Sequence, residues 1–228
     1  MVELLIRLKF TLGRHGSVGT RFFSLVMIAL GVGLTWYLAV AASSDQVRSG
    51  LLMLALAVWA SGWVLGPTIT NGVGVLRAQY FTLLPLDRDR VGAGLLVTAF
   101  VGLGPLLTLV ATATVAWHAW ASDPATLFLG LLGMMALLVF MVSLSRLVFR
   151  ALGVAMHSRI GMEIASLQWG LIVAGLFFGW MAVQPAFSAV SSLSREGLQG
   201  TVLTVVSAVP TSWPVLAVDA AATGSWGA

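Results

Sequence analysis

The sequence predicts an all-α fold: a polytopic helical membrane protein with about five transmembrane helices and an amphipathic helix at its N-terminus. Two observations lead to this prediction. Only 9% of the 228 residues carry a charge, whereas a soluble globular domain has about 25%. The apolar residues also fall in blocks of about 20 or more, the length that a helix needs to cross a bilayer. So few charges cannot cover the surface of a water-soluble protein of this size.

The N-terminal arm, residues 1–21, combines basic side chains with leucines at helical spacing. This pattern predicts a short amphipathic helix on the cytoplasmic membrane surface, and a simple helical lead-in to the first span is the alternative. The first span is expected at about 22–42. A cleaved signal peptide is disfavoured because its apolar region has roughly 7–15 residues, which is shorter than this block.

The predicted transmembrane domain covers 22–184, with spans at about 22–42, 50–70, 91–120, 126–149 and 164–184. The third span is longer than a bilayer is thick, and Pro105 near its middle predicts a kink. In the second span Gly62 and Gly66 form a GxxxG pair, which favours close helix packing inside the protein over a dimer interface. Residues 185–228 contain only a short apolar run broken by prolines. We therefore expect an extracytoplasmic or re-entrant segment there.

The distribution of basic residues predicts the orientation. Four lie in the N-terminal arm, three in residues 71–90 and three around and after the end of the fourth span, out of twelve Lys and Arg in the chain. Positively charged residues stay on the cytoplasmic side of a membrane. The N-terminus is therefore expected in the cytoplasm. Trp117 and Trp120 suit the outer interface, and His118 is expected to be interfacial as well.

The sequence offers little catalytic chemistry. The chain has no cysteine, which excludes disulfides and thiolate sites, and its basic residues do not form the continuous patch that nucleic acid requires. Lys9 is the only lysine and lies in no phosphate-binding loop. Ser61 and His118 are the one pair that could resemble a membrane protease, and helix packing explains Ser61 equally well. We expect no enzyme activity, cofactor or metal in this chain.

Residues 71–90, NGVGVLRAQYFTLLPLDRDR, are the most distinctive polar segment. Asn71 can cap a helix and Pro85 can end it, and the apolar residues between them recur at helical spacing. The charged run 87–90 then precedes the third span. The pattern predicts a short amphipathic helix parallel to the membrane on its cytoplasmic side. Two alternatives remain: a helix that only contacts lipid, and a re-entry turn whose arginines snorkel.

Three stretches together resemble the permease subunits of ABC-2-type transporters from high-GC Gram-positive bacteria. They are the basic arm LLIRLKFTLGR, the stretch FTLLPLDRDRVGAGLLVTAFVGLGPLL, and the tail AVPTSWPVLAVDAAATGSW. The tail is similar to the outer segment that these permeases carry before their next span. The resemblance implies an exporter built from this subunit, a second permease unit and a separate ABC ATPase that binds and hydrolyses ATP.

The resemblance also implies that residues 71–90 hold a coupling helix that docks on the ATPase. Its candidate contact residues are Leu76, Arg77, Gln79, Tyr80, Leu84, Asp87, Arg88, Asp89 and Arg90. A family unit has six spans, so the five predicted here lead us to expect a permease truncated after its fifth span. The alternative function is a structural or assembly protein of the membrane, in which residues 71–90 would only face lipid.

Overall fold

The computed structural model describes residues 7, 18–69, 94, 96–155, 170, 174, 177, 181 and 183–225. Every element within these ranges is a helix, which confirms the all-α class for this part of the chain. Most of the N-terminal arm (1–21), the predicted coupling loop (71–90) and most of the fifth predicted span (164–184) lie outside the described residues.

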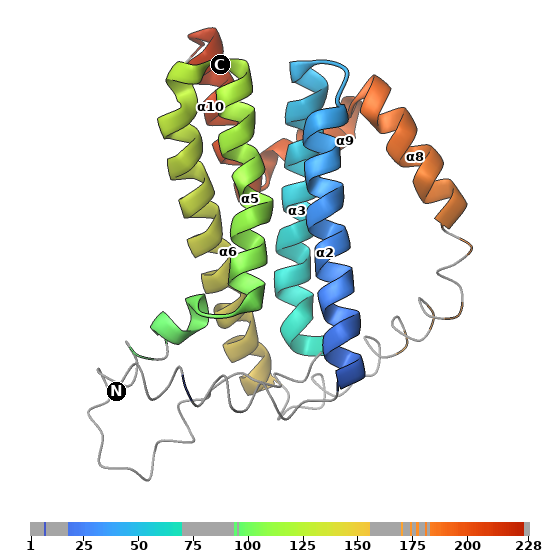
Figure 1. Cartoon of the computed structure of the whole chain (residues 1–228), viewed down its shortest axis with the longest axis vertical. Coiled ribbons are helices and arrows are strands. Elements are labelled where there is room, and N and C mark those ends of the chain that lie inside the picture. Colours follow the sequence, from blue (N-terminus) through green and yellow to red (C-terminus); the bar gives the residue numbers. More distant parts are fainter. Residues whose placement is uncertain are drawn as a thin grey trace.

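Four long helices form a bundle (Figure 1): α2 (Val18–Ala41), α3 (Asp45–Ile69), α5 (Leu103–Ser122) and α6 (Leu127–Ala155). One short turn joins α2 to α3 and another joins α5 to α6, so that each of these two pairs is antiparallel. Residues 42–44 connect α2 to α3, and Asp123 with the 3-10 turn η2 (Pro124–Thr126) connects α5 to α6. Both turns lie at the top of Figure 1, and we call this the upper end of the bundle.

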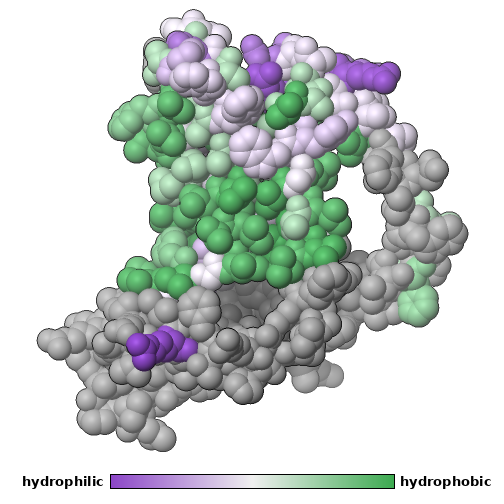
Figure 2. All heavy atoms as spheres, viewed as in Figure 1, coloured by the Kyte–Doolittle hydropathy of each residue, from purple (hydrophilic) through white to green (hydrophobic). Residues whose placement is uncertain are grey.

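The described residues contain three helices long and apolar enough to cross a membrane: Asp45–Val64, Leu103–Ser122 and Pro124–Val148. A fourth counts if the bent pair in the tail is one broken span, and α2 contributes a shorter apolar stretch, Ile28–Ala41. Figure 2 shows apolar side chains covering the middle of the bundle on this face, with hydrophilic residues gathered at the upper end. The length and composition of these helices indicate a membrane protein, whereas the predicted total of five spans stays a prediction.

The third predicted span, 91–120, is interrupted. Helix α5 begins only at Leu103 and has 20 residues, because Gly102 has φ 147° and ψ 175°, a backbone conformation essentially restricted to glycine. Residues 96–100 are helical but end before this break. Pro105 therefore lies in the first turn of α5, where its missing N–H needs no acceptor. The kink expected at Pro105 is replaced by a complete break three to four residues earlier, at residues 101–102.

The tail folds back onto the bundle. It consists of α8 (Val183–Glu196), α9 (Gly200–Ala208), the 3-10 turn η4 (Pro210–Ser212) and α10 (Trp213–Thr223). The α9 helix and the η4–α10 stretch are bent by 87° relative to each other, because Val209 is extended and Pro210 cannot continue a helix. In Figure 1, α8 inclines away from the bundle, while α9 passes behind α3 and α10 returns to the upper end.

Glycine allows α6 to approach both α5 and α10 closely. A Cβ on Gly130 would lie 2.5 Å from the Ala119 Cβ of α5, and a Cβ on Gly133 would lie 2.7 Å from the Pro214 Cβ of α10. By contrast, a Cβ on Gly62 would meet nothing within 4 Å, and Gly62 is exposed. The internal packing predicted from the Gly62–Gly66 pair is therefore absent at Gly62, and the close helix contacts use glycines that the sequence did not single out.

Candidate functional site

The nine candidate coupling residues, Leu76, Arg77, Gln79, Tyr80, Leu84, Asp87, Arg88, Asp89 and Arg90, all lie outside the described residues. Their proposed contact with an ATPase stays a prediction. The structure does describe helices on either side of this loop: α3 ends at Ile69 before it, and the helical residues 96–100 and then α5, from Leu103, come after it. The polar contacts among these helices are the candidate functional features of the described chain.

His118 of α5 forms a polar junction near the upper end of the bundle. Its Nε2 lies 2.8 Å from Oδ1 of Asp219 in α10 and 3.4 Å from Oγ of Ser49 in α3. The ring is 0% exposed, whereas the Asp219 side chain is 33% exposed. The interfacial position of His118 stays a prediction, and its full burial beside Asp219 of the returning tail was not predicted.

The proton on His118 follows from its neighbours. A carboxylate oxygen at 2.8 Å can only accept, so Nε2 carries the hydrogen. The Ser49 hydroxyl donates to the Asp45 carbonyl at 3.0 Å and can therefore only accept from Nε2. Nδ1 is buried and has no hydrogen-bond partner among the described residues. A hydrogen on Nε2 therefore satisfies both neighbours of the ring.

This junction does not have the geometry of a hydrolase. In a Ser–His–Asp triad the hydroxyl and the carboxylate bind opposite nitrogens of the ring, whereas Ser49 and Asp219 share Nε2. The pair considered from the sequence is not brought together: Ser61 donates to the Ala57 carbonyl of its own helix at 2.9 Å. No group of three His, Cys, Asp or Glu residues within the described ranges could hold a metal ion.

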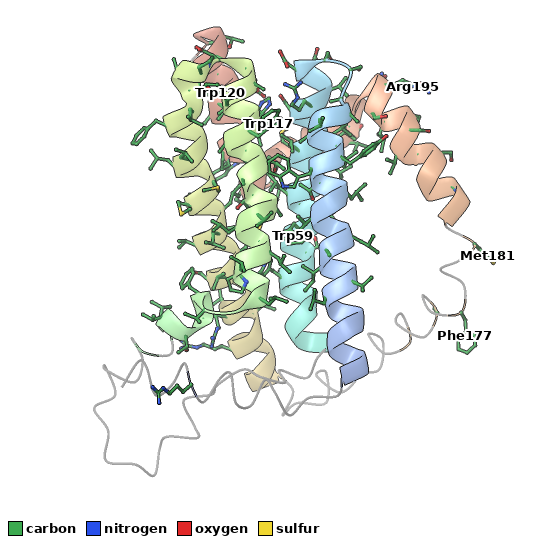
Figure 3. All side chains as sticks on the ribbon, viewed as in Figure 1. Trp59, Trp117, Trp120, Phe177, Met181 and Arg195 are labelled. Atoms are coloured by element: carbon green, nitrogen blue, oxygen red, sulfur yellow. The ribbon has the colours of Figure 1, made fainter. Side chains whose placement is uncertain are left out.

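A second polar contact joins α3 and α5 between their ends. The indole Nε1 atoms of Trp59 and Trp63 lie 3.1 Å and 2.8 Å from the Thr108 Oγ1, and this hydroxyl donates to the Gly104 carbonyl at 2.9 Å. Figure 3 shows Trp59 about midway along the bundle. Both tryptophans are on α3, one turn apart, so they reach the same side chain of the neighbouring helix.

Helix α5 is the polar helix of the bundle. Besides Thr108, it carries Thr112 and Thr114, both 0% exposed. Each hydroxyl donates to a carbonyl of its own helix: Thr112 to residue 108 at 2.9 Å and Thr114 to residue 111 at 2.6 Å. These bonds satisfy the hydroxyl donors without a partner helix.

Aromatic side chains mark the upper part of the bundle. Trp117 and Trp120 are 41% and 51% exposed and are labelled near the upper end in Figure 3. The Trp36 Nε1 donates to the Val110 carbonyl at 2.9 Å, and its ring centroid lies 6.4 Å from that of Trp117. Exposed tryptophans at one level of an apolar bundle are typical of a membrane–water interface, and the outer interface stays a prediction for Trp117 and Trp120.

Two polar contacts of the candidate site were not predicted from the sequence. Asp219 is the only acidic residue of the tail segment AVPTSWPVLAVDAAATGSW, and a lone carboxylate among apolar residues was a signal that could have identified it. Thr108 gave no comparable signal, because threonine is common in helices whose hydroxyls bond to their own backbone.

Comparison of the chain with models of protein families, with curated proteins and with solved structures found no match. Its function is therefore inferred from its own residues.

Proposed function

We propose that the chain is the membrane-spanning permease subunit of an ATP-driven ABC transporter, an exporter of the bacterial plasma membrane. In this proposal a separate ABC ATPase binds and hydrolyses ATP and docks on the loop 71–90, and a second permease unit completes the transport path. The N-terminus is cytoplasmic, so the upper end of the bundle faces away from the cytoplasm.

The bent helix pair in the tail carries the proposal. The segment whose sequence resembles the outer segment of ABC-2-type permeases, residues 208–226, includes η4 and α10, and these elements pack against α3, α5 and α6. With α9 they form a pair bent by 87° that returns to the upper end. Exposed Trp117 and Trp120 at the same end support its placement at the outer membrane surface.

The burial of charge also favours a motor outside the membrane. A transporter driven by an ion gradient carries ionisable groups within its spans. Among the described residues, His118 is the only buried ionisable side chain. It lies near the upper end and is already bonded to Asp219. Energy from an ATPase subunit agrees with such an apolar bundle better than a proton or ion relay does.

Affinity purification from the native host in mild detergent, followed by mass spectrometry, tests the proposal. We expect an ABC ATPase to co-purify with the tagged chain and to be lost when Arg77→Glu and Tyr80→Ala are combined in the loop. Ser188→Ala with Ser191→Ala is the matched control, because both hydroxyls are exposed and donate only to their own helix. The control variant should retain the ATPase.

One result would contradict the proposal as a whole, and another would contradict only the docking role of the loop. A stable, monodisperse chain that purifies without an ATPase favours the structural or assembly function. An ATPase that remains bound to the folded Arg77→Glu, Tyr80→Ala variant removes the docking role of the loop but keeps the transporter assignment.

A further inference from the structure

The Thr108 contact uses the full hydrogen-bonding capacity of one hydroxyl. A threonine hydroxyl has one donor and two lone pairs. The donor bonds to the Gly104 carbonyl, and the two lone pairs accept the indole N–H groups of Trp59 and Trp63. Serine keeps the hydroxyl donor and both lone pairs, whereas valine has nearly the same shape as threonine but has no hydroxyl.

The surroundings make this contact expensive to break. Thr108 is 1% exposed, and a Cβ on Gly104 would lie 3.6 Å from the Trp63 ring, so the Trp63 ring packs against the first turn of α5. Trp59 and Trp63 are half-buried, and within a bilayer an indole N–H that loses its acceptor finds no water to replace it. Sliding or rotation of α5 relative to α3 would leave two such donors without an acceptor at once.

The position of the contact in the chain bears on how α3 and α5 can move relative to each other. Residues 70–102 connect the end of α3 to the start of α5, so these are the two long helices that the connection joins. Near the upper end they meet again, through Ser49 and His118 at 3.4 Å. Two polar contacts at different heights restrict both tilt and rotation of α5 relative to α3.

We propose that Thr108 is a positioning residue that clamps α3 and α5 into one rigid unit, so that a displacement of the 70–102 connection reaches both helices together. The source of that displacement, an ATPase on the loop, rests on the proposed function, whereas the clamp itself does not. Without the clamp, such a displacement would move α3 and α5 separately.

Spin-label distance measurements on the full chain in lipid nanodiscs test the clamp. The sequence contains no cysteine, so Val58→Cys and Leu106→Cys, on α3 and α5, can be labelled uniquely. Both side chains are well exposed, at 63% and 55%. The variants are Thr108→Val, which removes the hydroxyl, and Thr108→Ser, which retains it.

We expect one narrow distance distribution for the parent chain and for Thr108→Ser, and a broadened or two-peaked distribution for Thr108→Val. Thr204→Val is the matched control, because this exposed hydroxyl donates only to the Gly200 carbonyl of its own helix, and it should leave the distribution unchanged. A folded Thr108→Val chain with the parent distribution overturns the proposal.

A second variant keeps the test decisive if Thr108→Val fails to fold. Combining Trp59→Phe with Trp63→Phe removes both indole donors and leaves the Thr108 hydroxyl bonded to Gly104, so no donor is left without an acceptor. The same broadening is expected, and an unchanged narrow distribution in this variant also overturns the clamp.

The complex with the co-purified ATPase extends the test to coupling. Between the nucleotide-free and vanadate-trapped states, the distance between the labels at positions 58 and 106 should stay constant in the parent chain and in Thr108→Ser, and should shift in Thr108→Val. A shift in the parent chain shows that α3 and α5 move separately and overturns the proposal. If no ATPase co-purifies, the proposed function fails, while the distances in the chain alone still decide the clamp.

Discussion

Replacing Gly130 with alanine should weaken the contact between α5 and α6. The added Cβ would lie 2.5 Å from the Ala119 Cβ, 3.0 Å from the Ala116 Cα and 3.1 Å from the Val115 carbonyl oxygen. These atoms belong to the backbone or to Cβ positions, so no rotamer change can remove the overlap. Because carbon atoms are in contact at about 3.5–4.0 Å, the two helices must separate locally by about 1 Å.

The loss of folding free energy caused by this separation can be estimated. Overpacking of a tight contact destabilises by about 1–3 kcal/mol, and the better helix propensity of alanine returns about 1 kcal/mol. The net loss for Gly130→Ala is therefore about 1 kcal/mol. For a chain of this size that corresponds to a fall in Tm of about 2–4 °C.

Thermal unfolding followed by tryptophan fluorescence in detergent or nanodiscs measures this effect, with Gly62→Ala as the matched control. An added Cβ at Gly62 meets nothing within 4 Å, so only helix propensity changes and the Tm should not fall. The expected order places Gly130→Ala below the parent chain and Gly62→Ala at or above it. If Gly130→Ala melts as high as Gly62→Ala, the close approach of α5 and α6 at this residue is refuted.

Three further predictions concern the tail. Gly133→Ala would place a Cβ 2.7 Å from that of Pro214, so hydrogen exchange should accelerate in α10; unchanged exchange there contradicts the contact. His118→Leu and Asp219→Leu should be non-additive in a thermal double-mutant cycle, with a coupling of about 0.5–3 kcal/mol, whereas additive losses would show that the pair is not bonded. Gly224→Ala puts a side chain at φ 69° and should cost about 1 kcal/mol, with faster exchange in the last turn of α10; equal exchange would contradict the left-handed cap.

The apolar helices could be predicted from the sequence because length and composition decide them. The predicted spans at 50–70 and 126–149 overlap the apolar helices at Asp45–Val64 and Pro124–Val148. The start of the third span could not be predicted in the same way. The sequence VGLGP contains two glycines and a proline, and hydropathy does not show which glycine adopts a positive φ and ends the preceding helix.

The polar contacts were much less predictable than the helices. The burial of His118 depends on Asp219, which lies 101 residues further along the chain, so only the return of the tail brings the two together. The Thr108 contact depends on which faces of α3 and α5 meet, and an almost uniformly apolar helix carries no periodicity that reveals its buried face. Close glycine contacts could not be predicted for the same reason. Gly62 belongs to a GxxxG pair but has no neighbour within 4 Å of an added Cβ, whereas Gly130 is tightly packed.

The short turn between α5 and α6 bears on how the chain enters the membrane during synthesis. With a histidine and several threonines, α5 is the least apolar of the three candidate spans, and α6 is the most apolar. Because the α5 hydroxyls bond to their own backbone, this helix can leave water before α3 is in contact with it. Only Asp123 and η2 separate it from α6. The two helices are thus suited to enter the bilayer together as a hairpin, with α6 compensating for the weaker apolar character of α5.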